Sequence, residues 1–383
     1  MNIELVNEVA QSFQEKFSGN PVLIFSPGRI NIIGEHTDYN DGFVFPAAID
    51  KGIVSAIQRT NNQQCAVYAV NKEEMYAFSL NEVAPVKNGG WRNYVVGVVE
   101  EILKKGIQLS PFNIAFGGDI PGGAGMSSSA ALENSIVFGL NELFHLGLSK
   151  KEMILISQLA EHNAVGVKCG IMDQYASMFG VKDCALQLDC RTIESKPFKI
   201  DFKDYQLLLI NTNVKHSLND SAYNNRRSVC ENIASLLKVK ALRDVSENDL
   251  ETIKNQVSEE DYQKALYVIQ ENARVVAASK AMDDGNLNEL GNLLFASHNG
   301  LQHQYKVSCE ELDFLVDKAN EYPTVLGSRM MGGGFGGCTI NLIKKTAATQ
   351  FKEEVAPAYY NLFNKDCSFY FVNLSDGTKR IHN

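Results

Sequence analysis

A dense group of hydrogen-bonding side chains occupies residues 26–39, SPGRINIIGEHTDY. It comprises Arg29, Glu35, His36, Thr37 and Asp38. Such a set suits a polyhydroxylated ligand, because sugar hydroxyls donate hydrogen bonds to carboxylates and accept them from cations and ring N–H groups. The spacing does not match a zinc-binding helix motif. A sugar-binding loop and a solvated polar loop both fit the pattern, and an arginine beside a Pro-Gly turn favours a site for a phosphate or a carboxylate.

A glycine- and serine-rich segment, PGGAGMSSSAAL, covers residues 121–132 between an expected strand and an expected helix. Glycines let the backbone approach a ligand closely and adopt positive φ angles. The first N–H groups of the helix favour an anion, and the serine hydroxyls suit phosphate oxygens or a hydrated magnesium ion. The segment is not a Walker A loop, since the chain has no Gly-Lys pair, and it is not GxGxxG, since Met126 and Ser127 occupy positions where that fingerprint needs free space. A phosphate cradle and a glycine-rich turn with a serine cap remain the two interpretations.

A single carboxylate, Asp173, lies in the otherwise uncharged segment 170–175, GIMDQY. A carboxylate in such surroundings must be paired or solvated, and Arg29 is a candidate partner. Asp173 is either a general base or the N-cap of a helix. Upstream, the helical pattern predicts Glu161 as a surface carboxylate, unless a magnesium ion requires it.

The composition restricts the classes of protein that the chain could form. Its 383 residues carry a net charge of −9, which argues against nucleic-acid and anionic-membrane partners. The eight cysteines are scattered without a CxxC pair, so we expect reduced thiols and a cytoplasmic protein. Residues 3–17 carry a helical apolar stripe rather than a signal peptide, and no apolar run is long enough to span a membrane.

Hydrophobic periodicity predicts the elements that must position these residues. We expect strands at 21–26, 53–59, 64–70, 112–116, 206–213, 338–343 and 368–374, and helices at 3–17, 93–105, 128–145, 150–166, several within 221–320, and 346–362. The alternation at 53–59 and 64–70 is typical of antiparallel strands. Strands dominate the first half and helices the second, which predicts an α+β fold. We expect two domains, residues 1–200 and 201–383, with the active site in the cleft between them.

Several segments together resemble the galactokinase family. Residues 26–46, SPGRINIIGEHTDYNDGFVFP, are very similar to its signature, and 169–180 and 211–227 also resemble galactokinase segments. PGGAGMSSSAAL and the run MGGGFGGC at 331–338 resemble motifs of the wider superfamily of galactokinase, homoserine, mevalonate and phosphomevalonate kinases. The resemblance implies a ribosomal-protein-S5-like N-terminal domain and a ferredoxin-like α+β C-terminal domain.

The resemblance also implies roles for individual residues. Asp173 would take the proton from the sugar C1 hydroxyl, and Arg29 would stabilise the charge on the moving phosphoryl group. The sugar would be held by Glu35, His36, Thr37, Asp38, Gly170 and Tyr223. The ATP phosphates would be wrapped by Gly123, Ala124, Gly125, Met126, Ser127, Ser128 and Ser129. Ser129 and Glu161 would hold Mg²⁺, and residues 332–337 would line the same cleft.

The implied activity is ATP-dependent phosphorylation of D-galactose by a monomer. Two other interpretations stay open from the sequence. One is a sister kinase for N-acetylgalactosamine, arabinose or galacturonate, and the other is a regulator that binds sugar and ATP without catalysis. The intact segment Ser129-Ala130-Ala131, together with Arg29 and Asp173, argues against the regulator.

Overall fold

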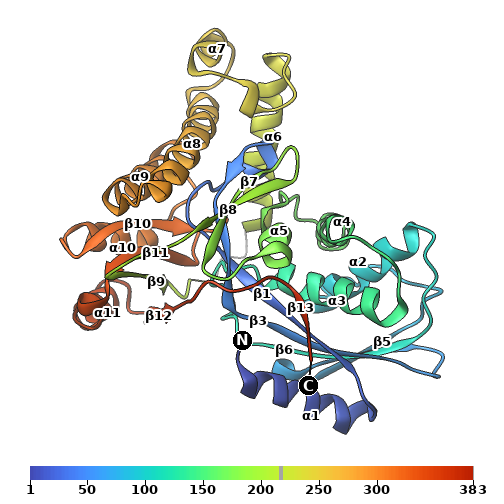
Figure 1. Ribbon diagram of the computed structural model, residues 1–383. Coiled ribbons are helices and arrows are strands. Elements are labelled where there is room, and N and C mark those ends of the chain that lie inside the picture. The colour runs from blue at the N-terminus through green and yellow to red at the C-terminus, as the bar shows by residue number, and fades with distance from the viewer. Residues whose placement is uncertain (215–218, 383) are drawn as a thin grey trace.

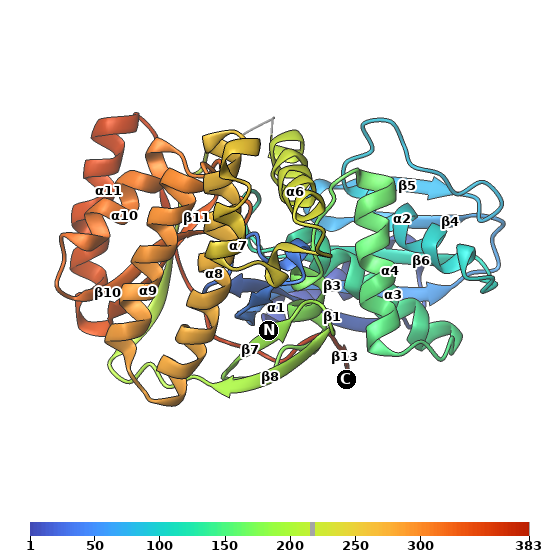
Figure 2. The same cartoon turned by 90° about the horizontal axis from the view of Figure 1, so that it is seen from above.

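The computed structural model describes residues 1–214 and 219–382, shown in two views in Figures 1 and 2. The α-helices are α1 (Ile3–Phe17), α2 (Trp91–Lys104), α3 (Ser128–Phe144), α4 (Lys150–Ala160), α5 (Met172–Phe179), α6 (Asn219–Leu236), α7 (Glu247–Glu251), α8 (Glu259–Asp283), α9 (Leu287–Asn299), α10 (Glu310–Asn320) and α11 (Ala348–Phe363). The strands are β1 (Val22–Asn31), β2 (Phe43–Val44), β3 (Pro46–Arg59), β4 (Cys65–Ala69), β5 (Glu74–Phe78), β6 (Phe112–Gly118), β7 (Cys184–Asp189), β8 (Glu194–Lys199), β9 (Tyr205–Asn211), β10 (Val325–Met331), β11 (Cys338–Lys344), β12 (Ser368–Phe371) and β13 (Lys379–Ile381).

A six-stranded sheet with the order β13-β1-β3-β6-β4-β5 forms the centre of the first half. Helix α1 covers one face of this sheet, and helices α2 to α5 lie on the other side (Figure 1). Successive side chains of a strand point to opposite faces. Ala56 of β3 therefore packs in the cluster beneath α1, whereas its neighbour Ile57 packs with the other helices. Burial on both faces explains the apolar run at residues 22–25 of β1 and the single polar side chain, Asn113, in β6.

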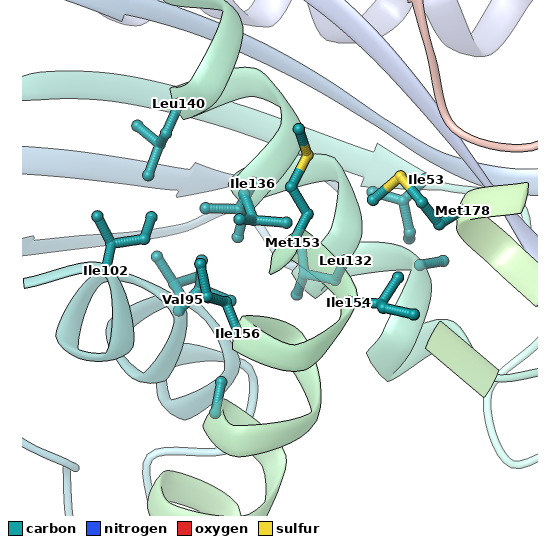
Figure 3. Close-up of a cluster of buried hydrophobic side chains, with 14 of the residues drawn as sticks. Ile53, Val95, Ile102, Leu132, Ile136, Leu140, Met153, Ile154, Ile156 and Met178 are labelled. Atoms are coloured by element: carbon teal, nitrogen blue, oxygen red, sulfur yellow. The ribbon is translucent and has the colours of Figure 1, made fainter. Parts of the chain in front are cut away.

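The larger apolar cluster holds the helices that carry the candidate functional residues. Figure 3 shows Leu132 and Ile136 of α3, Ile154 of α4 and Met178 of α5 packed around Ile53 of β3. All five side chains are buried. Burying a side chain of this size contributes about 1.5–3 kcal/mol relative to exposure. The cluster therefore fixes α3, α4 and α5, whose ends bear the glycine-serine loop, Glu161 and Asp173, on one rigid base.

A four-stranded antiparallel sheet, β10-β11-β9-β12, forms the second half together with helices α8 to α11. Neighbouring residues of β9 alternate between the two faces, with Leu208 packed against α10 and α11 and Leu209 against α8 and α9. Helix α9 approaches β10 closely at two glycines. A Cβ on Gly291 would lie 2.0 Å from the carbonyl oxygen of Leu326, and one on Gly327 would lie 2.5 Å from the Cα of Gly291.

The C-terminal segment returns to the first half of the molecule. Strand β13 pairs antiparallel with β1, with Leu23 opposite Ile381. Just before β13, the Thr378 hydroxyl lies 2.8 Å from the Ser26 hydroxyl of β1, and the Thr378 amide donates to the carbonyl of Ser177 in α5 over 2.8 Å. We name Ser26, Ser177 and Thr378 the seam, because they join β1 to α5. The boundary at residue 200 stays a prediction, but residues 378–381 lie with the first half.

Most expected elements are present, and the α+β fold is confirmed. The helix at 3–17, the buried strand at 206–213 and the helix that follows the glycine-serine loop occur within a few residues of their expected bounds. The strands at 53–59 and 64–70 are not neighbours, because β6 lies between β3 and β4 and pairs with both. The hairpin β7–β8 was not expected from the sequence. Within the described part of the chain, no helix has both the length and the apolar character that a membrane crossing needs.

We expect Gly291→Ala to lower the free energy of unfolding by about 1–3 kcal/mol, because the added methyl group would force α9 away from β10. Helix propensity alone would favour alanine at this position. Asn292→Ala, an exposed change in the same helix, is the matched control. Chemical denaturation of the three proteins measures the effect. Equal stability of Gly291→Ala and the control would contradict the close backbone packing.

Candidate active site

A cavity of about 120 Å³ lies where the two halves meet. It is lined by Arg29, Glu35, His36, Asp38, Glu161, Val167, Cys169, Met172, Asp173, Tyr223, Gly332 and Gly333. These residues come from β1 and the loop after it, from the C-terminal end of α4 and the segment beyond it, from α5 and α6, and from the loop after β10. Polar groups from distant parts of the chain therefore converge on one concave surface, the usual form of a small-molecule site.

The ion pair of Arg29 and Asp173 forms one wall of the cavity. The Arg29 Nε donates to Asp173 Oδ1 over 2.8 Å and the second guanidinium nitrogen donates to Oδ2 over 3.0 Å. A further guanidinium nitrogen donates to the carbonyl of Gly125 over 2.5 Å. Burial acts to lower the pKa of Arg29, but Asp173, Glu35 and Asp38 outweigh it and raise that pKa. The expected pairing is confirmed, and its bidentate geometry fixes the orientation of the carboxylate.

The glycine-serine loop is joined directly to this ion pair. The Ser127 hydroxyl donates a hydrogen bond to Asp173 Oδ2. Ser127 adopts a left-handed backbone conformation (φ +55°), immediately before the first residue of α3, and its side chain does not cap that helix. The backbone N–H groups at the start of α3, near Ser128 and Ser129, are thus not bonded by the side chain of the N-cap serine. That arrangement supports the phosphate cradle over the capped turn.

The second glycine run lies against the glycine-serine loop. A Cβ on Gly125 would lie 3.2 Å from the carbonyl oxygen of Met331, and one on Gly337 would lie 3.6 Å from that of Gly123. Both glycines have positive φ angles, +68° at Gly125 and +84° at Gly337, which larger residues rarely adopt. The amide of Gly332 donates to Glu35 Oε1 over 2.7 Å. The second glycine run thus joins the glycine-serine loop to the cavity, which it lines at Gly332 and Gly333, and a place in the same cleft for residues 334–337 stays a prediction.

Glu35 is fixed by a buried arginine that sequence reasoning missed. Arg329 of β10 is fully buried and lies 3.2 Å from Glu35 Oε1. Its guanidinium also donates to the carbonyls of Asn31 and Ile32, while the Asn31 amide donates to Glu35 Oε2 over 2.5 Å. A buried cation requires acceptors on every side. Arg329 thus holds the loop after β1 against the second half, and its only sequence signal is a charge within the apolar segment 325–331.

Asp38 and Gly170 shape the opposite wall. A Cβ on Gly170 would lie 2.1 Å from Asp38 Oδ2, so only glycine leaves room for this carboxylate. Burial raises the pKa of Asp38 to about 7, with Asp173 and Glu35 adding to the shift. Tyr223 of α6 lines the cavity, whereas residues 215–218 of the segment 211–227 lie outside the described residues.

Thr37 does not line the cavity, although the resemblance implied a sugar contact. Its side chain is buried, and its hydroxyl lies 2.9 Å from the carbonyl oxygen of Gly34 and 2.6 Å from that of Phe43. These contacts close the loop on itself. Thr37 therefore shapes the loop that presents its neighbours His36 and Asp38, and a direct contact between Thr37 and a sugar stays a prediction.

Glu161 is buried rather than on a helix surface, so the surface prediction is wrong. It begins the segment η3 (Glu161–Val165), a wide helical turn at the end of α4. Gln174 donates to Glu161 Oε2 over 3.0 Å, and the Ser129 hydroxyl also hydrogen-bonds to Glu161. Burial and Asp173 raise the pKa of Glu161 to about 7. Sequence periodicity shows which face of a helix is polar. It does not show that this face packs against other polar side chains instead of facing solvent.

Glu133 of α3 is a second carboxylate that the sequence analysis did not identify. It is fully buried, lies 3.4 Å from Gln174 Nε2 through Oε2, and its Oε1 makes no hydrogen bond to a described residue. Burial raises the pKa of Glu133 well above its ordinary value, and Glu161 and Asp173 add to the shift. The chain thus concentrates carboxylates at the end of the cavity beside the glycine-serine loop.

The residues present fit a magnesium ion. Mg²⁺ prefers hard oxygen ligands and keeps several waters or phosphate oxygens, so it needs only one or two protein ligands. Glu161 and the Ser129 hydroxyl supply such oxygens, and the unpartnered Glu133 oxygen leaves the region short of positive charge. In the part of the chain that the structure describes, no group of three or more His, Cys, Asp and Glu side chains could hold a metal. A shared protein–phosphate coordination shell is therefore the form that fits.

Comparison with known protein families matches three parts of the chain. The galactokinase galactose-binding signature matches residues 11–59, the GHMP kinase N-terminal domain matches residues 93–181, and the GHMP kinase C-terminal domain matches residues 278–362. The first match contains the polar loop after β1, and the second contains the glycine-serine loop, Glu161 and Asp173.

Similar proteins extend the match to nearly the whole chain. The galactokinase of Clostridium acetobutylicum is 38% identical, covering 99% of this chain and 100% of that protein, and that of Thermotoga maritima is 40% identical, covering 93% and 99%. The crystal structure of Lactococcus lactis galactokinase complexed with galactose has a TM-score of 0.94 at 33% identity, over 98% of this chain and 100% of that one. Methanococcus jannaschii mevalonate kinase, at 18% identity and a TM-score of 0.66 over 94% of this chain and 99% of that one, shares the fold.

We expect the stability of the metal-free protein to reveal the buried Glu161 carboxyl. Its pKa rises on folding from 4.5 to about 7, so its stabilising contribution is present below pH 4.5 and is lost as the pH rises to 7. Glu161→Gln has no such loss, so relative to the parent protein it should gain up to about 3 kcal/mol of unfolding free energy between pH 5 and pH 8.

Chemical denaturation at both pH values, with a chelator present, measures this difference. Glu353→Gln, an exposed change on α11, controls for the loss of one negative charge. If Glu161→Gln and Glu353→Gln differ from the parent equally at both pH values, the buried, proton-holding state of Glu161 is refuted.

Proposed function

The chain belongs to the galactokinase family, and we propose on that premise that it transfers the terminal phosphoryl group of ATP to the C1 hydroxyl of D-galactose. The products are galactose 1-phosphate and ADP. The observation that carries the proposal is the Arg29–Asp173 ion pair, which is hydrogen-bonded to the glycine-serine loop on one side and faces the polar cavity on the other. A carboxylate thus lies between a site for hydroxyl groups and a site for phosphates.

The cavity offers a sugar both acceptors and donors. Glu35 and Asp38 supply carboxylate oxygens, and His36 and Tyr223 supply a ring nitrogen and a phenol. Glu35 is already oriented by Arg329 and the Gly332 amide, so little ordering is needed when a ligand binds. The loop after β1 thereby serves as the sugar-binding segment, with the neighbouring Gly170 leaving room for Asp38.

The glycine-serine loop and the N-terminus of α3 would receive the ATP phosphates. Residues 123–129 present backbone N–H groups, with positive φ at Gly123, Gly125 and Ser127. Glu161 and Ser129 would hold Mg²⁺, which when bound neutralises phosphate charge. Glu161 would then exchange its proton for the metal, since the carboxylate form binds a cation.

Asp173 faces the acceptor hydroxyl in this arrangement. Two hydrogen bonds from Arg29 and one from Ser127 fix the direction in which the carboxylate oxygens of Asp173 point. Phosphoryl transfer depends mainly on positioning and on neutralising charge. Orientation of the hydroxyl is therefore the larger part of the role of Asp173, which takes up the proton as the new P–O bond forms. Arg29 places a positive charge beside the moving group.

The sequence alternatives are less well supported. The related sugar kinases and the non-catalytic regulator have no specific observation in their favour, whereas the relatives named galactokinase cover nearly the whole chain. A protein that only binds sugar and ATP would also have no need for the arrangement of Arg29, Asp173 and Ser127. The site is complete within one chain, which supports a monomer. ATP as co-substrate supports a cytoplasmic location.

The proposal is tested by measuring ADP release with ATP, Mg²⁺ and a panel of sugars. We expect galactose to give the highest kcat/KM, and glucose, N-acetylgalactosamine, arabinose and galacturonate to give little turnover. A higher kcat/KM with another sugar would replace galactose as the substrate. Binding of ATP and galactose without ADP release from either would identify a regulator.

A second prediction concerns the carboxylate itself. Asp173→Asn should retain the fold and galactose binding but lose about 10²- to 10⁴-fold in kcat, because the amide cannot take up the proton and breaks the bidentate pairing with Arg29. Steady-state kinetics and galactose titration by calorimetry measure the two effects. Asp119→Asn, a change outside the cavity, controls for the loss of a carboxylate charge. Near-normal turnover of Asp173→Asn would remove Asp173 from the reaction.

A further inference from the structure

A chain of hydrogen-bonding groups runs from His36 away from the cavity. The His36 Nδ1 lies 2.8 Å from the Tyr39 hydroxyl, which lies 2.7 Å from the Tyr305 hydroxyl. The Cys230 Sγ lies 3.4 Å from the same Tyr305 hydroxyl. The four groups come from the loop after β1, from η1 (Asp38–Asn40), from the residue after η6 (Gly300–Gln304) and from α6. We name Tyr39, Tyr305 and Cys230 the relay.

The surroundings hold the His36 ring in one orientation. Its centroid lies 4.9 Å from that of Tyr305 and 5.4 Å from that of Tyr223. The Asn40 side chain donates to the His36 carbonyl over 2.9 Å, and His36 itself has a left-handed backbone (φ +63°). Burial, with help from Arg226 and Arg329, lowers the pKa of His36 to about 3. The ring is thus neutral near pH 7 and carries a single N–H, on either Nδ1 or Nε2.

The relay can run in two directions, and each one fixes a different tautomer. In one, the Cys230 thiol donates to Tyr305, Tyr305 to Tyr39, and Tyr39 to the lone pair of His36 Nδ1, so that the hydrogen is on Nε2. In the other, Nδ1–H donates to Tyr39 and every donation is reversed. The thiol is both a weak donor and a weak acceptor, so the Cys230 end of the relay does not favour either direction.

The cavity side of the ring distinguishes the two directions. His36 Nε2 is buried and makes no hydrogen bond of ordinary geometry to a described residue, yet the Gly333 carbonyl is near enough to favour a protonated ring. With the hydrogen on Nδ1, the lone pair of Nε2 would lie near this carbonyl oxygen, and the two would repel each other. With the hydrogen on Nε2, the ring presents a donor there. The forward direction therefore avoids a lone pair facing this carbonyl and leaves Nε2 with a hydrogen for a ligand to accept.

We propose that Tyr39 and Tyr305 are positioning residues that hold His36 as the Nε2–H tautomer, so that the ring offers the cavity a hydrogen-bond donor. The proposal rests on the proposed function only for the kind of ligand, a sugar whose hydroxyl oxygen accepts that hydrogen bond. The carboxylates of Glu35 and Asp38 accept hydrogen bonds from ligand hydroxyl groups. A fixed donor on His36, which lies between them in the chain, instead binds the oxygen of a ligand hydroxyl. Tyr39 and Tyr305, which do not line the cavity, then help to determine which ligands it binds.

The tautomer can be measured without sugar or nucleotide by two-bond ¹H–¹⁵N correlation spectra of the full-length protein at pH 7. The chain has seven histidines, and the signals that vanish in His36→Gln assign the ring. We expect a protonated Nε2 and an unprotonated, hydrogen-bonded Nδ1. Hydrogen on Nδ1, or an equal mixture of the two tautomers, would overturn the proposal. This result does not depend on turnover, so it stands apart from failure of the proposed function.

Two variants test whether the relay is the cause. Tyr39→Phe and Tyr305→Phe should each shift His36 toward a mixed tautomer and raise the KM for the sugar by about 3- to 10-fold, with kcat within about 2-fold, the size of one lost hydrogen bond. Tyr262→Phe removes another tyrosine hydroxyl bond, a partly buried one to Glu251, and should change neither the spectrum nor the KM. An unchanged tautomer and KM in both relay variants would refute the proposal. So would loss of kcat alone. If a variant does not fold, the spectrum of the parent protein still decides the tautomer.

Discussion

The burial of Arg29 is the constraint on which the rest of the site depends. A guanidinium that is only 4% exposed must be surrounded by acceptors, or the fold would carry an uncompensated charge costing several kcal/mol. Asp173 and the Gly125 carbonyl provide those acceptors, and they come from α5 and from the loop before α3. The cation therefore sets the distance between three elements that share no local sequence. The apolar cluster in Figure 3 brings α3 and α5 onto the sheet, and the ion pair fixes how their ends meet.

The carboxyl groups around this cavity hold their protons more tightly than free ones. Burial and neighbouring carboxylates raise the pKa of Asp38 and of Glu161 to about 7, and they also raise the pKa of Glu133. These side chains therefore contribute less than their full negative charge near pH 7. The net charge of −9 is no obstacle to phosphate binding under these conditions. In the proposed function, anions would be received by backbone N–H groups and a helix end, while the acidic side chains would suit the cation that accompanies nucleotides.

Sequence reasoning reached the features that follow from periodicity or from the cost of an unpaired charge, and it missed most of those made by distant packing. The helix stripe at 3–17 and the pairing of Arg29 with Asp173 follow from periodicity and from the cost of an unpaired buried charge. The burial of Glu161 could not be predicted, since its helix pattern does not reveal the wall formed by α3 and α5. Arg329 was missed because its partners are backbone carbonyls and Glu35, about 300 positions away. The separation of β3 from β4 arises because β6, which follows a long helical excursion, pairs with both.

The seam of Ser26, Ser177 and Thr378 has a consequence for how the molecule is made. It ties the strand that carries Arg29 to the helix that carries Asp173, and Ser26 and Thr378 are 352 positions apart. A contact of such long range cannot form until the ribosome has added residue 378 and that residue has left the exit tunnel. Domains generally begin to fold from the N-terminal side during synthesis. The first sheet can thus assemble early around β3, with β1 and α5 joined by the Ser26–Ser177 contact and the Arg29–Asp173 ion pair. Its outer edge beside β1 stays open to other strands until the end of translation, when residues 378–381 complete the seam and the sheet.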